Sequence, residues 1–192
     1  KNGKLIVDST KTAARTTTSI NVKRPENASA QGIDVSYHQG VINWEKVKNT
    51  GKVDFAIIRC GYGMNEWNET TQTWTQDDPQ WEYNTSECER LNIPYGVYLY
   101  SYADTTEKAK SEAEHVIRML EGKNLSYPIY YDMEDKSVMN NSKITAAKAS
   151  QIAQTFLNTM KAAGYNNLGV YSSKYYFETK LTASVFNQYP KW

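Results

Sequence analysis

Two carboxylates near the middle of the chain, Asp132 and Glu134, have the residue types and the spacing for acid–base chemistry. They belong to the segment Tyr-Tyr-Asp-Met-Glu-Asp at 130–135. Side chains alternate across a strand, so both carboxylates would point to one face, and Met133 and Asp135 to the other. Like charges about 6 to 7 Å apart resist joint ionisation, which raises the pKa of one and leaves an acid beside a base. The alternative is a solvated acidic strand end that caps the next helix.

A third carboxylate, Asp34, lies inside an otherwise apolar segment. Alternation would place Asp34 and Ser36 on one face of this strand, with Ile33 and Val35 on the other. In a parallel barrel the inward residues at the C-terminal strand ends build the active site, so Asp34 could converge there with the carboxylate pair. A structural ion pair is the alternative interpretation.

Tyrosine is unusually abundant, with 15 residues beside five tryptophans. The same alternation sends Tyr98 and Tyr100 to one face of their strand, and Tyr171 on the strand 168–172 and Tyr62 after the strand 53–60 could join them. Tyrosines around an acid pair suit a sugar-binding cleft, because the rings stack on sugars and the hydroxyls form hydrogen bonds. Ordinary packing of the interior is the alternative for each ring.

The histidines and cysteines offer weaker candidates. His38 could orient an acid or bind substrate, or it could be a hydrogen-bonded structural residue, whereas His115 lies inside a predicted helix and is interpreted as structural. A nucleophilic pair of Cys60 with His38 finds little support, because Cys60 sits in an apolar segment where nothing predicts a lowered pKa. The two cysteines, Cys60 and Cys88, have no metal-binding spacing, and the sequence contains neither HExxH nor GxSxG.

Elements that could position these residues alternate along the chain from Gln31 onward. Helix-like segments separate apolar, strand-like segments, which predicts an α/β protein with a parallel sheet, either a barrel or a doubly wound sheet. Neither GxGxxG nor GxxxxGK[ST] follows a strand, so a nucleotide-binding version loses its main support. The predicted strands are 32–37, 53–60, 94–102, 128–133 and 168–172.

Capping and stop signals delimit the predicted helices. One begins after Asp104, with Thr105 and Thr106 as alternative caps, and stops at Gly122, whereas a second stops at Gly164. A third begins near Asp78-Pro79 and runs to about Asn92, and the segment 61–77 before it is predicted to be a long, functional loop.

Length and composition favour one domain with a tail. The 192 residues are 40% hydrophobic; residues 1–30 are interpreted as a linker or the end of an upstream region, and 31–192 as the folded domain. Lys and Arg number 22 against 21 Asp and Glu, so no net field attracts nucleic acid or an anionic membrane. No stretch approaches the roughly 18 apolar residues that membrane insertion requires.

Several segments in order resemble glycoside hydrolase family 25, the Chalaropsis-type lysozymes. The resemblance covers about Gln31 to Trp192, and the combination is far more specific than any one segment. The segments are GIDVSYHQG at 32–40 with INW at 42–44, FAIIRCGYG at 55–63, YGVYLY at 95–100 and DME at 132–134.

The resemblance implies a TIM-like β/α barrel that hydrolyses the β-1,4 bond between N-acetylmuramic acid and N-acetylglucosamine in bacterial peptidoglycan. Glu134 matches the general acid, Asp132 its carboxylate partner and Asp34 the acidic residue of the first strand. No metal or organic cofactor is implied, and the expected location is extracellular or in the cell wall. The substrate-binding candidates are Tyr62, Tyr98, Tyr100, Tyr171 and His38.

The carboxylate spacing leaves the stereochemistry of this reaction open. An i, i+2 pair falls between the separations typical of a direct nucleophile and of an inverting base, which favours attack by the substrate's own acetamido oxygen. Two other functions also remain open: a non-catalytic glycan-binding module built on an incomplete barrel, and a barrel hydrolase of another polysaccharide such as chitin.

The number of strands predicts an incomplete barrel. Five strand-like segments and the start of a sixth at Lys191-Trp192 fit into the sequence, whereas an eight-stranded barrel takes roughly 200 or more residues. We therefore expect that residues 1–192 alone are not an active, stable monomer. A missing C-terminal barrel segment or a partner chain would fill the gap.

Overall fold

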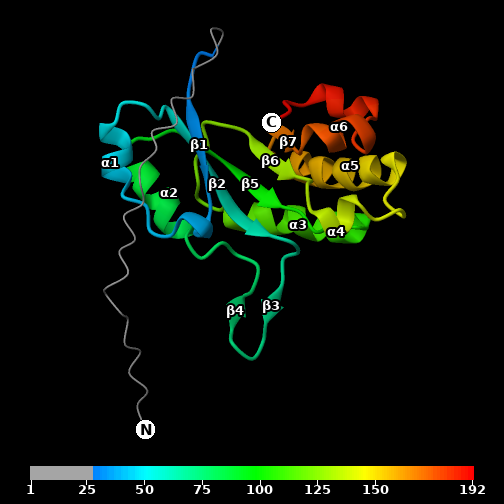
Figure 1. Ribbon diagram of the computed structural model, residues 1–192. Helices are drawn as coiled ribbons and strands as arrows, with labels where there is room; N and C mark the ends of the chain where they lie inside the picture. The colour runs from blue at the N-terminus through cyan, green and yellow to red at the C-terminus, as the bar shows by residue number, and fades with distance from the viewer. Residues whose placement is uncertain (1–27) are drawn as a thin grey trace, which may run out of the picture.

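A curved five-stranded parallel sheet forms the centre of the computed structural model, which describes residues 28–192 (Figure 1). Its order is β1-β2-β5-β6-β7, and each neighbouring pair is parallel. Parallel neighbours require crossover connections, which helices supply here. The predicted α/β class is confirmed. The strands span Gly32–Val35 (β1), Phe55–Tyr62 (β2), Tyr95–Tyr100 (β5), Ile129–Asp132 (β6) and Leu168–Tyr171 (β7).

The sheet is open within residues 28–192. No pairing joins β1 to β7 there, so the described part of the chain does not contain a closed barrel. Lys191-Trp192, where the sequence predicts a sixth strand to start, pairs in parallel along β7. The Trp192 N–H donates to the Val170 carbonyl at 3.0 Å, and the Ser172 N–H donates to the Trp192 carbonyl at 3.3 Å. Of the predicted linker, residues 1–27 lie outside the described residues.

The three predicted helices form, with ends close to those expected. Thr105 caps α3 by accepting a hydrogen bond from the Lys108 N–H, and Gly122 and Gly164 follow α3 and α5 with positive φ angles of 73° and 95°. The α-helices are Trp44–Asn49 (α1), Trp81–Arg90 (α2), Thr106–Met119 (α3), Lys136–Met139 (α4), Ala146–Ala162 (α5) and Lys174–Thr179 (α6), and the 3-10 helices are Tyr37–Gln39 (η1) and Ser184–Gln188 (η2).

Two predicted boundaries are corrected by side-chain capping. The first strand stops at Val35, because the Ser36 hydroxyl caps η1 and turns the chain. Helix α2 starts at Trp81, later than predicted. Asp78 lies before the helix, where its carboxylate accepts hydrogen bonds from the Gln80 N–H and from the Nε of Arg59 on β2.

The segment predicted to be a loop is also partly ordered. It contains an antiparallel hairpin of Trp67–Asn68 (β3) with Thr73–Trp74 (β4). The Asn68 side chain accepts hydrogen bonds from the N–H groups of Thr70 and Thr71, which forms the turn at the tip. The hairpin projects away from the sheet beyond the end of β2 (Figure 1).

The two faces of the sheet have different roles. Tyr131 of β6 points to the helical side and stacks on Phe156 of α5, with ring centroids 3.9 Å apart, whereas its neighbour Asp132 has the opposite parity. The register between β2 and β5 shifts between Arg59 and Gly61, a bulge that brings Arg59 and Tyr62 to the same face. The polar candidates therefore share the face opposite the helices.

Among the helices of residues 28–192, none combines the length and the apolar composition needed to cross a bilayer.

Candidate active site

Asp132 is the most perturbed carboxyl of the candidate site. It ends β6, its side chain is almost fully buried at 3% exposure, and its Oδ1 atom has no hydrogen-bond partner. Burial raises the pKa of Asp132 to about 8, with a further rise from the charge of Glu134, and Arg59 opposes the shift. The predicted elevation of one pKa in the pair thus falls on Asp132.

Glu134 follows β6 and reaches a more open position. Met133 between the two carboxylates is buried in the core, as the alternation predicts, whereas Glu134 is only partly buried. The Tyr171 hydroxyl bonds to Glu134, and burial together with the charge of Glu134 raises the pKa of Tyr171. A hollow of about 440 Å³ opens beside Glu134, lined by Tyr100, Glu134, Asp135, Lys136, Ser173, Tyr175 and Tyr176.

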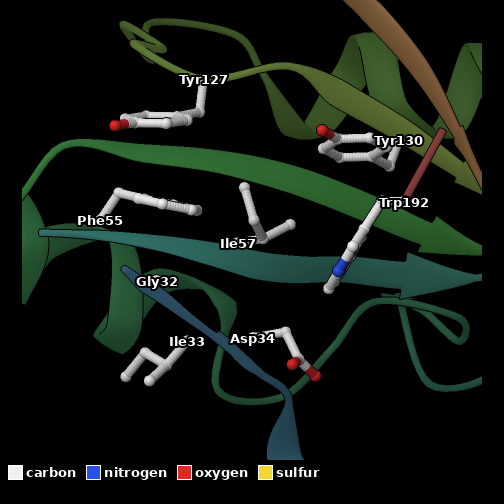
Figure 2. A pocket seen from close by; sticks show the side chains of 8 residues that line it. All are labelled: Gly32, Ile33, Asp34, Phe55, Ile57, Tyr127, Tyr130 and Trp192. Carbon is white, nitrogen blue, oxygen red and sulfur yellow. The ribbon is translucent and has the colours of Figure 1, made fainter. Parts of the chain in front are cut away.

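Asp34 lies on β1 at a second hollow of about 240 Å³ (Figure 2). Its carboxylate is exposed, and its charge contributes to the raised pKa of Asp132. Within residues 28–192 no ion pair involves Asp34, so the structural interpretation gains no support. Figure 2 shows the Asp34 carboxylate on the same side of the sheet as the rings of Tyr130 and Trp192.

Asp135 corrects a further prediction. Alternation places it on the face of Met133, whereas Asp135 lines the same hollow as Glu134, and its Oδ1 caps α4 by accepting from the N–H groups of Ser137 and Val138. Its Oδ2 atom accepts a hydrogen bond from the Tyr100 hydroxyl at 3.3 Å. The helix-capping carboxylate considered for this strand end is therefore Asp135.

Arg59 is the residue of this site that the sequence analysis missed. It lies on β2 with 6% exposure, and its guanidinium is 4.7 Å from the ring centre of Tyr37 and 5.4 Å from that of Tyr62. Its Nε donates to Asp78, while its Nη2 is buried without a partner. Buried unpaired polar atoms are rare, so Nη2 and the Asp132 Oδ1 atom are positions where a ligand or water can bind.

The predicted tyrosines divide into two aromatic groups. Tyr98 and Tyr171 contact the Trp192 ring, with centroid distances of 6.2 and 4.7 Å, and burial raises the pKa of Tyr98. Tyr100 and Tyr62 each contact Tyr102 instead, at 5.2 and 6.4 Å. Trp192 was not predicted to belong to the site, because its place depends on pairing along β7.

His38 has an aromatic neighbour. Its ring lies on exposed η1, 4.0 Å from the ring of Tyr37. Burial raises the pKa of Cys60 far above its usual range, which excludes an activated thiolate there. His115 is fully buried and bonded to Asp77 and the Gly63 carbonyl, as a structural histidine would be. No cluster of metal-ligating side chains occurs in residues 28–192.

A comparison with protein families identifies the relationship. A model described as glycosyl hydrolases family 25 matches residues 33–192. The chain belongs to glycosyl hydrolase family 25. The family resemblance predicted from the sequence is therefore confirmed, and the carboxylates, tyrosines and Arg59 described above all lie within the matched residues.

Solved structures include close relatives of this family 25 chain. It is 36% identical to the modular autolysin LytC of Streptococcus pneumoniae, with a TM-score of 0.73 over 85% of this chain and 37% of that chain. LytC was also solved in complex with a synthetic peptidoglycan ligand, at 34% identity and a TM-score of 0.72 over the same shares. A family 25 glycosyl hydrolase from Bacillus anthracis has the same fold at 16% identity, with a TM-score of 0.72 over 88% of this chain and 71% of that chain.

Curated relatives of the family 25 chain include an Escherichia coli protein described as uncharacterized protein YegX. The two are 22% identical over 178 residues, 91% of this chain. The chain spans 59% of the length of YegX.

Proposed function

We propose that this family 25 chain contributes the catalytic carboxylates of a peptidoglycan hydrolase, a muramidase that cleaves the β-1,4 bond after N-acetylmuramic acid. The observation that carries the proposal is the pairing of buried Asp132, with its raised pKa, and Glu134 beside an open hollow. Two interacting carboxyls of this kind retain one proton between them at neutral pH. An acid beside a carboxylate is the state that glycoside hydrolysis requires.

Glu134 is assigned as the general acid because it is the more accessible of the two. It donates a proton to the glycosidic oxygen as the bond from that oxygen to C1 breaks. When the shared proton lies on Glu134, Asp132 is ionised, and its negative charge and that of Asp34 stabilise the positive charge that develops on C1. The acetamido oxygen of the same sugar attacks C1 and forms a cyclic oxazolinium intermediate. Water then adds its hydroxyl to C1, the bond between C1 and the acetamido oxygen breaks to restore the acetamido group, and the second proton of water returns to Glu134.

The remaining parts of the proposal concern the substrate and the setting. Tyr98, Tyr100, Tyr171 and Tyr62 bind the glycan through their rings and hydroxyls, and His38 contacts it from η1. The substrate is bacterial peptidoglycan, outside the cell or in the wall, and residues 31–192 form the catalytic unit. The LytC complex with a synthetic peptidoglycan ligand supports this substrate class.

Digestion of purified peptidoglycan, followed by mass spectrometry of the new reducing ends, tests the proposal. A muramidase leaves N-acetylmuramic acid at the new reducing end, whereas cleavage of the other glycosidic bond leaves N-acetylglucosamine. Binding of peptidoglycan without turnover would favour a glycan-binding module. Faster cleavage of chitin oligomers than of peptidoglycan would favour a different polysaccharide hydrolase.

A further inference from the structure

The β3–β4 hairpin carries two exposed tryptophans that the proposed active site does not use. Trp67 and Trp74 are 40% and 36% exposed and face each other across the hairpin, with ring centroids 5.2 Å apart. A cross-strand aromatic pair stabilises a short hairpin. That role does not require the hairpin to project from the sheet (Figure 1), and it leaves a large area of both indoles in contact with water.

The hairpin is held rigidly against helix α3. Arg118 of α3 lies 4.0 Å from the ring centre of Trp74, and its Nε donates to Asn65 at 2.8 Å. At the other end of the hairpin, Asp77 accepts from Arg118 Nη1 at 3.1 Å and lies 2.9 Å from the buried His115 Nε2. Both ends of the segment are therefore fixed, so a ligand would meet a preorganised surface.

Aromatic contacts connect the hairpin to the candidate active site. The Tyr62 hydroxyl donates to the Thr75 carbonyl at 3.5 Å, and Tyr62 contacts Tyr102, which contacts Tyr100. Tyr100 in turn donates to Asp135, one residue from Glu134. A hollow of about 110 Å³ lies between the hairpin base and α3, lined by Gly63, Met64, Glu66, Gln76, Tyr102, Lys108 and Glu112.

The charge of the hairpin limits what it can bind. Residues 64–76 include Glu66 and Glu69, no lysine and no arginine, and otherwise mainly Asn, Thr and Gln beside the tryptophans. The hairpin's own residues are acidic and the neighbouring Arg118 is paired with Asp77, which disfavours an anionic membrane surface. Sugar rings fit instead, because their apolar faces stack on indoles and their hydroxyls bond to amides and hydroxyls.

We propose that the β3–β4 hairpin is a glycan-binding platform, which holds sugar units of the same polysaccharide strand beyond those at Glu134. The platform deepens the proposed function and rests on it for the identity of the strand. The platform predicts that affinity increases with the length of the glycan, because a glycan long enough to reach Trp67 makes a contact that a short oligosaccharide does not make.

The test compares short and long peptide-free glycan strands of peptidoglycan, bound to the full chain with Glu134→Gln so that they are not cleaved. We expect NMR signals of the Trp67 and Trp74 indole N–H groups to shift with long strands and not with a disaccharide. Indole signals that stay unchanged while long strands bind would overturn the platform. This measurement leaves the hairpin unaltered, so a folding defect cannot confuse it.

Substitution of Trp67 measures how much this contact contributes to glycan affinity. We expect Trp67→Ala to weaken the binding of long strands roughly 3- to 10-fold, the value of one aromatic contact, and Trp67→Phe to restore most of it. Tyr83→Ala is the matched control, because Tyr83 is 37% exposed on α2 and should leave this affinity unchanged. Equal long-strand affinity in Trp67→Ala and wild type would overturn the platform. Muramidase activity is measured separately on the wild-type chain. If that chain hydrolyses peptidoglycan but the indole N–H signals do not shift with long strands, only the platform is refuted.

Discussion

Arg59 and Asp78 form a buried ion pair, with Arg59 Nε 2.7 Å from Asp78 Oδ2. Asp78 also accepts the Tyr37 N–H at 3.0 Å, which fixes the loop after β1 against the end of β2. The guanidinium nitrogen Nη2 is buried without a partner, and the positive charge of Arg59 opposes the rise in the pKa of Asp132. The pair therefore holds a cation at the reacting centre.

Removal of this cation should shift the pH dependence of the reaction. Activity is expected to fall as pH rises through about 8, where the carboxyl pair loses its shared proton. Without Arg59 the pKa of Asp132 rises further, so Arg59→Met moves this fall to higher pH. The measurement is kcat/KM against pH.

The control for this experiment addresses stability. Breaking a buried pair leaves an uncompensated charge and costs roughly 3–5 kcal/mol, so Arg59→Met is combined with Asp78→Asn, which keeps an acceptor for the Tyr37 N–H. Arg59→Lys retains the charge and should show the wild-type profile. If the fall in kcat/KM at alkaline pH occurs at the same pH in the Arg59→Met variant as in wild type, the electrostatic role of Arg59 is refuted.

Glu134→Gln should remove most activity while folding and glycan binding change little. General acid catalysis is worth roughly 10²- to 10⁴-fold in turnover, and an amide cannot supply the proton. The measurement is turnover on peptidoglycan, with melting temperature and glycan affinity as controls. A variant that keeps more than about a tenth of wild-type turnover would require another acid.

Asp132→Asn should lower activity and yet stabilise the fold at alkaline pH. The folded pKa of about 8 exceeds the ordinary value of 3.8, so between these values the folded state holds a proton that the unfolded state releases. Wild-type stability therefore falls as pH rises through this window, and the neutral amide does not titrate. We expect the variant to have a higher melting temperature than wild type at pH 8 and the same melting temperature at pH 3. Each kcal/mol of unfolding free energy corresponds to roughly 2–4 °C in melting temperature.

Asp34→Asn should lower turnover by at least about tenfold with little loss of stability. The reason is that Asp34 is exposed and contributes negative charge to the site, without an ion pair in the described part of the chain. Turnover and melting temperature decide between the interpretations. A large loss of melting temperature at unchanged activity would support the structural role considered from the sequence.

Asp135 provides an internal control because its two substitutions should differ. Asp135→Asn keeps an oxygen that can cap α4 and accept from Tyr100, so activity and stability should stay close to wild type. Asp135→Ala removes the cap and should cost about 0.5–2 kcal/mol. Denaturant titration of both variants checks this, and an asparagine variant as inactive as Glu134→Gln would place Asp135 in the reaction itself.

The strands and the carboxylate pair could be predicted because both depend on local periodicity. Alternation along a strand determines which side Asp132, Met133 and Asp34 face, and apolar segments bounded by polar residues locate the strands. Arg59 could have been found by the argument used for Asp34, since it too is a charged residue inside an apolar strand. Its identification was missed because the surrounding segment was interpreted as core.

Contacts between distant residues could not be predicted in the same way. The partner of Arg59 lies 19 residues away, and Trp192 joins Tyr98 and Tyr171 only because the chain returns to the edge of β7. Local patterns carry no information about such pairings. The short helices α1, α4 and α6 have too few turns to show a helical period.

The bulge in β2 determines where insertions and deletions can be tolerated. Because the register shifts between Arg59 and Gly61, the chain enters the hairpin with Tyr62 on the same face as Arg59. Deleting a single residue within the bulge would turn Tyr62 to the helical side and separate it from the guanidinium. Lengthening the turn at 69–72 would leave the bridge between Gly61 and Asp77 in place, so the hairpin can vary in length while the site keeps its geometry.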